Sequence, residues 1–247
     1  MTVAVDFFME IQTILLRYIR MRFLIIRHAE PYYPTDSLTE KGYKEAELLS
    51  NRLVKEHITK AYVSPLGRAK LTAKPTLDKL GIEAEELFWL REFPRGLKTK
   101  YVVRGGAENS CPWNMPPEDW MRIPGVWDPE AWKNAPIYAG TGIPEAFEEI
   151  SANLDALCAT WGFVRNETGF YDVKPGYEES TDTVALFCHL GLGNALLAHF
   201  MHASLPFVWH TLFLPVSSVT TVMMEMHREH TANARLVSVG DTSHLFA

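Results

Sequence analysis

Residues 21–30 have the sequence Met-Arg-Phe-Leu-Ile-Ile-Arg-His-Ala-Glu, and they frame the interpretation of the whole chain. Residues 23–26 form a short, uninterrupted apolar run, which is typical of a strand buried on both faces of a sheet. The run ends at Arg27 and His28, whose side chains can bind an anion or react with one. The sequence therefore predicts a central strand that presents two basic side chains at its carboxyl end.

Strand and helix patterns alternate along the rest of the chain. Apolar or β-rich runs predict strands at residues 61–63, 87–90, 183–188, 216–224 and 236–239, and periodic patterns predict helices at residues 38–56, 64–80, 144–162 and 191–201. Ser64 is a candidate N-cap, Pro65 suits a first helical position and Gly81 is a candidate C-cap. The alternation predicts an α/β fold, a three-layer sandwich with a mostly parallel central sheet and helices on both faces.

Two segments do not follow this alternation. Residues 93–142 are rich in proline, glycine and tryptophan, and we expect an inserted lid with short helices, anchored by burial of the tryptophans at positions 113, 120, 127 and 132. Residues 1–20 precede a clean strand pattern and are expected to form an N-terminal extension, with a docked helix as the alternative. The sequence thus predicts one domain over residues 21–247.

Composition excludes several classes of function. The chain of 247 residues has a net charge of −6, so it lacks the basic surplus that general nucleic-acid binding requires. Its longest apolar stretch, residues 184–201, is interrupted by His189, Asn194 and glycines, so no membrane-spanning helix is expected. The three cysteines are scattered and form no CxxC pair, which favours a reducing, cytoplasmic location over a disulfide framework or a zinc ribbon.

Three of the predicted strands end in side chains suited to one oxyanion. The first strand runs into Arg27 and His28, the second into a helix start with Arg68, and the strand at residues 183–188 into His189. Ligands of open α/β sheets bind beyond the carboxyl ends of the strands, so these side chains are expected to meet in one crevice. Two arginine forks match the oxygens of a phosphate dianion. No DxD, HExxH or Walker lysine lies nearby, so no metal or other cofactor is expected.

A phosphate site without a metal needs a nucleophile and a proton donor. An imidazole nitrogen can attack phosphorus and form a phosphohistidine, which splits the transfer into two steps. Glu92 is the candidate acid, because it follows the predicted strand at residues 87–90. Its neutral form needs a raised pKa, which burial favours and the arginines oppose. A surface salt bridge is the alternative role for this carboxylate.

Five short segments lie in a fixed order along the chain. They are Leu-Ile-Ile-Arg-His-Ala-Glu at residues 24–30, Leu-Thr-Glu-Lys-Gly at 38–42, Ser-Pro-Leu-Gly-Arg-Ala at 64–69, Cys-His-Leu-Gly at 188–191 and Asp-Thr-Ser-His-Leu at 241–245. Each segment alone is weak to moderate evidence. The ordered set resembles the histidine phosphatase (phosphoglycerate mutase-like) superfamily, phosphatase branch, and the resemblance covers the chain from about residue 21 onward.

The resemblance implies roles for the residues at matching positions. His28 would be the phosphorylated nucleophile. Arg27, Arg68 and His189 would bind the phosphoryl oxygens and the charge of the transition state. Glu92 would donate a proton to the leaving group and then act as base for the attacking water.

The chain departs from the family pattern at two positions. The family usually has glycine after the first histidine, and here the residue is Ala29, which requires a negative φ. The family often has glycine after the second histidine, and here Leu190 could shift a backbone donor or add an apolar wall. Histidine pairs at positions 199 and 202 and at 227 and 230 could hold a metal, but packing or surface placement is the favoured interpretation.

Three functions fit this set of residues. The first is a phosphomonoester hydrolase whose partner is a small-molecule phosphate ester, with neither nucleic acid nor membrane involved. The second is a phosphoglycerate mutase-type phosphotransferase that retains the phosphoryl group, and the third is a non-catalytic protein that binds a phospho-ligand. The aromatic composition of residues 93–142 favours an apolar or aromatic leaving group.

Overall fold

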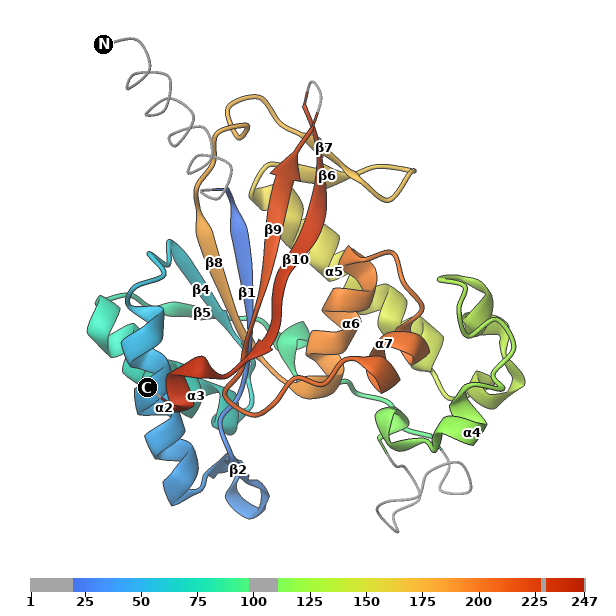
Figure 1. Cartoon of the computed structure of the whole chain (residues 1–247), viewed down its shortest axis with the longest axis horizontal. Coiled ribbons are helices and arrows are strands. Elements are labelled where there is room, and N and C mark those ends of the chain that lie inside the picture. The colour runs from blue at the N-terminus through green and yellow to red at the C-terminus, as the bar shows by residue number, and fades with distance from the viewer. Residues whose placement is uncertain (1–19, 98–110, 228–229, 247) are drawn as a thin grey trace, which may run out of the picture.

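The structure, a computed structural model, describes residues 20–97, 111–227 and 230–246. Figure 1 shows a central sheet covered on both faces. Helices α2 (Glu40–Leu53) and α3 (Gly67–Leu80) lie against one face, and α5 (Ile143–Thr160) and α6 (Leu190–Phe200) lie against the other. The predicted α/β sandwich is confirmed.

In the described part of the chain, the sheet has eight strands in the order β5-β4-β8-β1-β9-β10-β7-β6. Their bounds are β1 (Arg22–Arg27), β4 (Lys60–Val63), β5 (Ala84–Glu86), β6 (Phe163–Arg165), β7 (Tyr171–Val173), β8 (Thr183–Cys188), β9 (Val219–Met226) and β10 (Thr231–Asp241). The half formed by β5, β4, β8 and β1 is parallel, and the strands from β9 onward pair antiparallel. The carboxyl ends of β1, β4 and β8 therefore meet at one edge, the lower one in Figure 1.

Alternate residues of β1 face the two helical layers. Leu24 and Ile26 pack with Leu49 of α2, whereas Phe23 and Ile25 belong to the larger core on the side of α5 and α6. All four β1 side chains are at most 1% exposed, and each such burial contributes about 1.5–3 kcal/mol relative to an exposed side chain. Because helices cover both faces, this strand is apolar throughout, as its sequence predicts.

The long apolar stretch at residues 184–201 is divided between β8 and α6. Every residue of β8 is buried, and α6 is buried along most of its length, since it lies between the sheet, α5 and the short helix α7 (Leu205–Thr211). His189 stands at the junction of strand and helix, where it is the N-cap residue of α6. Among the described residues, no helix is long and apolar enough to cross a membrane.

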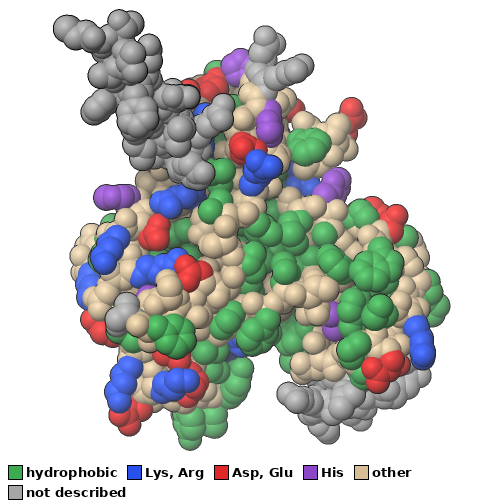
Figure 2. Space-filling model, viewed as in Figure 1, with side chains coloured by type: hydrophobic (Ala, Val, Ile, Leu, Met, Phe, Trp, Pro, Cys, Tyr) green, Lys and Arg blue, Asp and Glu red, His purple; other side chains and the backbone are tan. Residues whose placement is uncertain are grey.

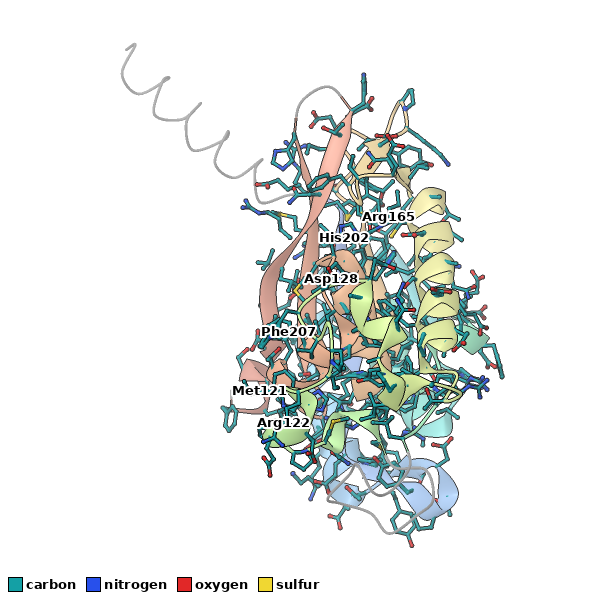
Figure 3. All side chains as sticks on the ribbon, turned by 90° about the vertical axis from the view of Figure 1, so that its right-hand side faces the viewer. Met121, Arg122, Asp128, Arg165, His202 and Phe207 are labelled. Atoms are coloured by element: carbon teal, nitrogen blue, oxygen red, sulfur yellow. The ribbon has the colours of Figure 1, made fainter. Side chains whose placement is uncertain are left out.

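The segment between β5 and α5 consists of short helical turns. Its described elements are the 3-10 helix Phe88–Leu90, the 3-10 helix Pro112–Asn114, α4 (Pro117–Trp120) and the 3-10 helices Ala131–Asn134 and Pro136–Tyr138. Trp120 stacks on His210 of α7 with ring centroids 5.0 Å apart, and Trp127 lies 5.3 Å from Phe207 of the same helix. These contacts join the segment to α7. Figure 3, which views the right-hand side of Figure 1, labels Met121, Arg122 and Phe207 there. In Figure 2, hydrophobic side chains gather on the same right-hand part of the molecule.

Not all tryptophans of this segment are buried as predicted. Trp132 is fully buried and Trp120 nearly so, as expected for anchors, and Trp113 is half-buried. Trp127 is 62% exposed, so it covers Phe207 without being buried itself. The remainder of the predicted insertion, residues 98–110, and the predicted extension up to residue 19 lie outside the described residues.

Several predicted element boundaries were wrong. Residues 88–90 form a 3-10 turn and not a strand, and the strand of that region is β5, which comes earlier. Ser64 does not cap a helix, because its hydroxyl is bonded to His189, and α3 begins only at Gly67 with Leu66 as its N-cap residue. Strand β10 is longer than the predicted run at residues 236–239, whereas Gly81 closes α3 in the left-handed conformation expected of a C-cap.

Candidate active site

The end of β1 is held on both sides by backbone hydrogen bonds. The Arg27 amide donates to the carbonyl of Ser218, the His28 amide donates to the carbonyl of Cys188, and the Ser217 amide donates to the carbonyl of His28, at 3.0–3.1 Å. Because β8 and β9 flank this strand, the loop that follows β1 leaves the sheet in one fixed direction. The backbone thereby positions the Arg27 and His28 side chains at the carboxyl edge.

The imidazole of His28 is 2% exposed and has one hydrogen-bonded nitrogen. Its Nδ1 lies 2.8 Å from the carbonyl oxygen of Ala29, and since a carbonyl only accepts, we assign the proton to Nδ1. Burial lowers the pKa of His28 to about 4; the Ala29 carbonyl raises it, and Arg27 and Arg68 lower it further. The ring is therefore neutral at pH 7, and Nε2 keeps a free lone pair.

His189 faces His28 across the site. The two ring centroids are 5.1 Å apart, and His189 is fully buried. Its Nε2 lies 2.7 Å from the hydroxyl of Ser64, while Nδ1 has no hydrogen-bond partner within the described residues. Burial, His28 and both arginines lower the pKa of His189, so this ring is also neutral. If the Ser64 hydroxyl donates to Nε2, the proton of His189 resides on Nδ1.

The two arginines are fixed by different partners. Arg68, in the first turn of α3, forms an ion pair with Asp36, and the other carboxylate oxygen of Asp36 accepts from the Gly67 amide at 2.6 Å. Arg27 donates from Nη1 to the carbonyl of Leu214. The Nε atoms of both guanidinium groups are buried and have no partner in the described portion of the structure. Each guanidinium thus has buried donor capacity available to an anion.

Glu92 follows the 3-10 turn and approaches the start of α6. Its Oε1 accepts from the amides of Phe93 at 2.9 Å and Leu192 at 3.1 Å. Burial raises the pKa of Glu92, and the two amides, Arg27 and Arg68 act against that rise. The salt-bridge alternative does not hold among the described residues, where this carboxylate accepts only from backbone amides. A half-buried carboxyl with a raised pKa is suited to hold a proton for transfer.

All five residues predicted for the site are therefore gathered at one place. Arg27 and Arg68 each act on the pKa of His28, of His189 and of Glu92, which places these groups within electrostatic reach of one another. The five side chains thus lie together beyond the strand ends, as predicted.

Sequence reasoning missed the residues that support this cluster. They are Ser64, which orients His189; Asp36, which holds Arg68; and Thr72, whose hydroxyl accepts from the Ala29 amide and donates to the Arg68 carbonyl. Ser64 lies within one of the quoted motifs and could have been found there. Asp36 could not, because only the turn between β2 (Pro31–Tyr32) and β3 (Ser37–Leu38) brings it to α3.

The two departures from the family pattern have local explanations. Ala29 is fully buried against Leu38 and Ala46 and does not have a positive φ, so its methyl group is accommodated. Leu190 begins α6 and packs against the larger core. The glycine needed nearby is Gly191, where an added Cβ would lie 2.1 Å from the ring of Trp113 and 2.9 Å from Oε1 of Glu92.

The histidine pairs considered for a metal have other partners. His199 pairs with Asp155 at 2.7 Å, and His227 lies 2.6 Å from the side-chain oxygen of Asn233. His230 pairs with Glu178 at 3.0 Å. In the part of the chain that the structure describes, no group of three or more His, Cys, Asp or Glu side chains is arranged to hold a metal ion.

Solved structures share this fold. A phosphoserine phosphatase mutant from Entamoeba histolytica in complex with phosphoserine superposes with a TM-score of 0.58 at 19% identity, over 91% of this chain and 99% of that one. A mycobacterial glucosyl-3-phosphoglycerate phosphatase with bound VO3 gives 0.57 at 21% identity, over 89% and 98%. The architecture is thus that of an α/β class of proteins that includes phosphatases.

Sequence comparison finds a family model that matches part of the chain. Residues 23–106, which contain four of the five predicted site residues, match the model of the histidine phosphatase superfamily (branch 1). Phosphoserine phosphatase 1 of Hydrogenobacter thermophilus is 25% identical over 146 residues, and the match spans 56% of this chain and 64% of that protein's length, just under two thirds. Over residues 23–106, the chain is therefore similar in sequence to the histidine phosphatase superfamily.

Proposed function

We propose that this chain is a phosphomonoester hydrolase that acts on a small phosphorylated metabolite through a phosphohistidine intermediate at His28. The observation that carries the proposal is the hydrogen bond between Nδ1 of His28 and the Ala29 carbonyl, which leaves Nε2 as a free nucleophile. The lowered pKa keeps that nitrogen unprotonated at neutral pH. The match of residues 23–106 to the superfamily model and the phosphoserine phosphatase among the relatives support the same reaction.

In the first step, Nε2 of His28 attacks phosphorus and the bond between phosphorus and the ester oxygen breaks. The proton of Glu92 passes to that oxygen, and the alcohol leaves. Arg27, Arg68 and the Nδ1 proton of His189 bind the phosphoryl oxygens, on which the negative charge of the transition state lies. These donors are held in place before substrate arrives, so little reorganisation is needed during the reaction.

In the second step, the Glu92 carboxylate takes a proton from a water molecule, whose oxygen attacks phosphorus. The bond between phosphorus and Nε2 breaks, inorganic phosphate forms, and His28 returns to its neutral state. Glu92 regains the proton that it gave to the alcohol, so the cycle is balanced. The raised pKa of Glu92 suits both transfers, since it allows the carboxyl to be protonated before the first step.

Two measurements test this proposal. The protein is incubated with a phosphate ester labelled on phosphorus and quenched in alkali, and the label is expected as phosphohistidine on the peptide that contains His28. His28→Ala should lose both the label and the release of phosphate, whereas His227→Gln, at an exposed histidine, should keep both. Release of phosphate without a bisphosphate primer supports hydrolysis, and primer-dependent isomerisation would establish a mutase instead. Phosphate-ester binding without turnover or label would establish a non-catalytic binding protein.

A further inference from the structure

Two exposed aromatic rings lie against the two arginines of the site. The ring of Tyr33 is 5.5 Å from the guanidinium of Arg68, and the ring of Phe213 is 6.0 Å from that of Arg27. Tyr33 is 66% exposed and Phe213 is 68% exposed, although rings of this size are usually buried. Neither ring belongs to the hydrophobic core clusters formed by the described residues. Packing of the hydrophobic core therefore gives no reason for aromatic rings at these two exposed positions.

The rings come from two segments that contact the arginines at the carboxyl edge of the sheet. Tyr33 begins the 3-10 turn Tyr33–Thr35 between β2 and β3, and Phe213 lies in the loop between α7 and β9. Figure 1 places the β2 segment below the sheet, the direction in which the carboxyl ends of β1, β4 and β8 point. A third aromatic side chain, Trp113, lies next to Glu92, because both would contact a Cβ at Gly191. Aromatic surface thus accompanies both arginines and the acid that serves the leaving group.

The charge of the site leaves little for a second anionic group of the substrate. Among the described residues, the cations that act on the pKa of His28 and His189 are Arg27 and Arg68. Arg68 is paired with Asp36, whose carboxylate also acts on His28. The phosphoryl dianion therefore uses the positive charge that these residues provide. Among the described residues, a carboxylate elsewhere on the substrate would face aromatic rings and Asp36.

We infer that Tyr33 and Phe213 are specificity-determining residues, and that the preferred substrate is the phosphate ester of an uncharged alcohol with an aromatic or similarly flat, apolar group. The inference rests on the proposed function and names the substrate class for that same site. The flat group lies against the two rings, so the contact area that they expose is covered when substrate binds. The guanidinium groups of the two arginines meanwhile stay hydrogen-bonded to the phosphoryl oxygens.

The test compares three esters of primary alcohols, so that the chemistry of the leaving oxygen is similar. They are benzyl phosphate, propyl phosphate and O-phosphoserine. We expect kcat/KM of the wild-type protein to be highest for benzyl phosphate and lowest for O-phosphoserine. Phe213→Ala and Tyr33→Ala should each lower kcat/KM for benzyl phosphate by about three- to tenfold, the range expected for loss of one aromatic contact. The same variants should change kcat/KM for propyl phosphate less than twofold or so.

Phe88→Ala is the matched control. Phe88 is 65% exposed and its ring also lies over an arginine, 4.4 Å from the guanidinium of Arg91. It should leave the ratio of the three substrates unchanged. Phe213→Leu and Tyr33→Leu keep an apolar side chain and should retain part of the preference for benzyl phosphate.

Each outcome separates the inference from the proposed function. Equal or better turnover of O-phosphoserine than of benzyl phosphate would overturn the inference and leave the phosphatase intact. An equal loss for all three esters in the alanine variants would also overturn it, because the rings would then only position the arginines. No turnover of any ester by the wild type, together with no phosphohistidine, would overturn the proposed function and this inference with it.

Discussion

The hydroxyl of Ser64 lies 2.7 Å from Nε2 of His189, which joins the end of β4 to the end of β8 through the site itself. Ser64 also accepts from the Leu66 amide at 3.2 Å, so its own proton is free to point at the imidazole. The tautomer of His189 that carries its proton on Nδ1, the proposed donor to the phosphoryl group, thus depends on one buried serine.

Ser64→Ala should therefore lower kcat without a comparable change in KM. Without Ser64, the Nδ1 proton of His189 is no longer held in place as a donor. This loss is expected to lower kcat about ten- to a hundredfold, at the low end of what removal of a transition-state donor costs. Steady-state kinetics with benzyl phosphate measure this effect. Ser50→Ala removes another fully buried hydroxyl, remote from the site, and should keep kcat. An unchanged kcat in Ser64→Ala would contradict the role assigned to this hydroxyl.

The pKa shifts of His28 and Glu92 set the pH dependence of kcat/KM. His28 must be unprotonated, so activity should rise as pH rises through about 4. Glu92 must be protonated, so activity should fall as pH rises through its pKa, which burial raises above the ordinary value. In Glu92→Gln the basic limb should disappear from the pH profile. The rate should fall far more for benzyl phosphate than for 4-nitrophenyl phosphate, whose leaving group needs little protonation. Equal losses for the two esters would refute the role of acid.

The same histidine should make the folded state sensitive to acid. The pKa of His28 is lowered on folding, so below pH 6.5 the unfolded chain binds a proton that the folded chain excludes, and stability falls as pH falls. Between pH 6.5 and 5 this amounts to about 2 kcal/mol, at about 1.36 kcal/mol per pH unit. Glu92 acts in the opposite sense, because its pKa is raised.

The contribution of His28 can be isolated by comparing variants. Urea unfolding of wild type and His28→Asn at pH 7 and pH 5 should show that the variant loses about 2 kcal/mol less on acidification. His227→Gln, at an exposed position, should follow the wild type. Parallel behaviour of His28→Asn and wild type would show that His28 titrates alike in both states.

A single methyl group added at Gly191 should displace the carboxyl group of Glu92, the proposed acid. In Gly191→Ala the new Cβ would meet the Trp113 ring at 2.1 Å and Oε1 of Glu92 at 2.9 Å, so one or both must move. We expect a loss of about 1–3 kcal/mol in stability from overpacking and a lower kcat for benzyl phosphate. Adding Trp113→Leu to this variant should restore most of the stability. Full activity of Gly191→Ala would show that Glu92 tolerates displacement.

Local patterns predicted the long, buried strands and helices well and the short strands poorly. β1 and β8 are continuous apolar runs, and α5 has a clear periodic pattern, so each was found within a residue or two. β6 and β7 have three residues each; they pair with each other, and β7 also pairs with β10, which no local pattern encodes. The turn at residues 88–90 resembles a strand in composition, but its residues have no strand partner.

The same distinction applies to the site. Arg27, His28 and His189 were predictable because each directly follows a strong strand signal. Their geometry was not, since it depends on side chains that meet across the fold, such as Asp36 with Arg68 and Ser64 with His189. Glu92 was selected through a strand that does not exist where it was predicted, and it reaches the site through the amide of Leu192 instead.

The position of β1 between β8 and β9 also governs when the protein can first act. Strand β1 is synthesised long before its partners β8 and β9, and the carbonyls of Cys188 and Ser218 that accept from the His28 and Arg27 amides belong to those later segments. A nascent chain on the ribosome therefore cannot assemble the candidate site until β9 has emerged. Closing such distant pairings is slow compared with local helix formation, so synthesis and activity are separated in time.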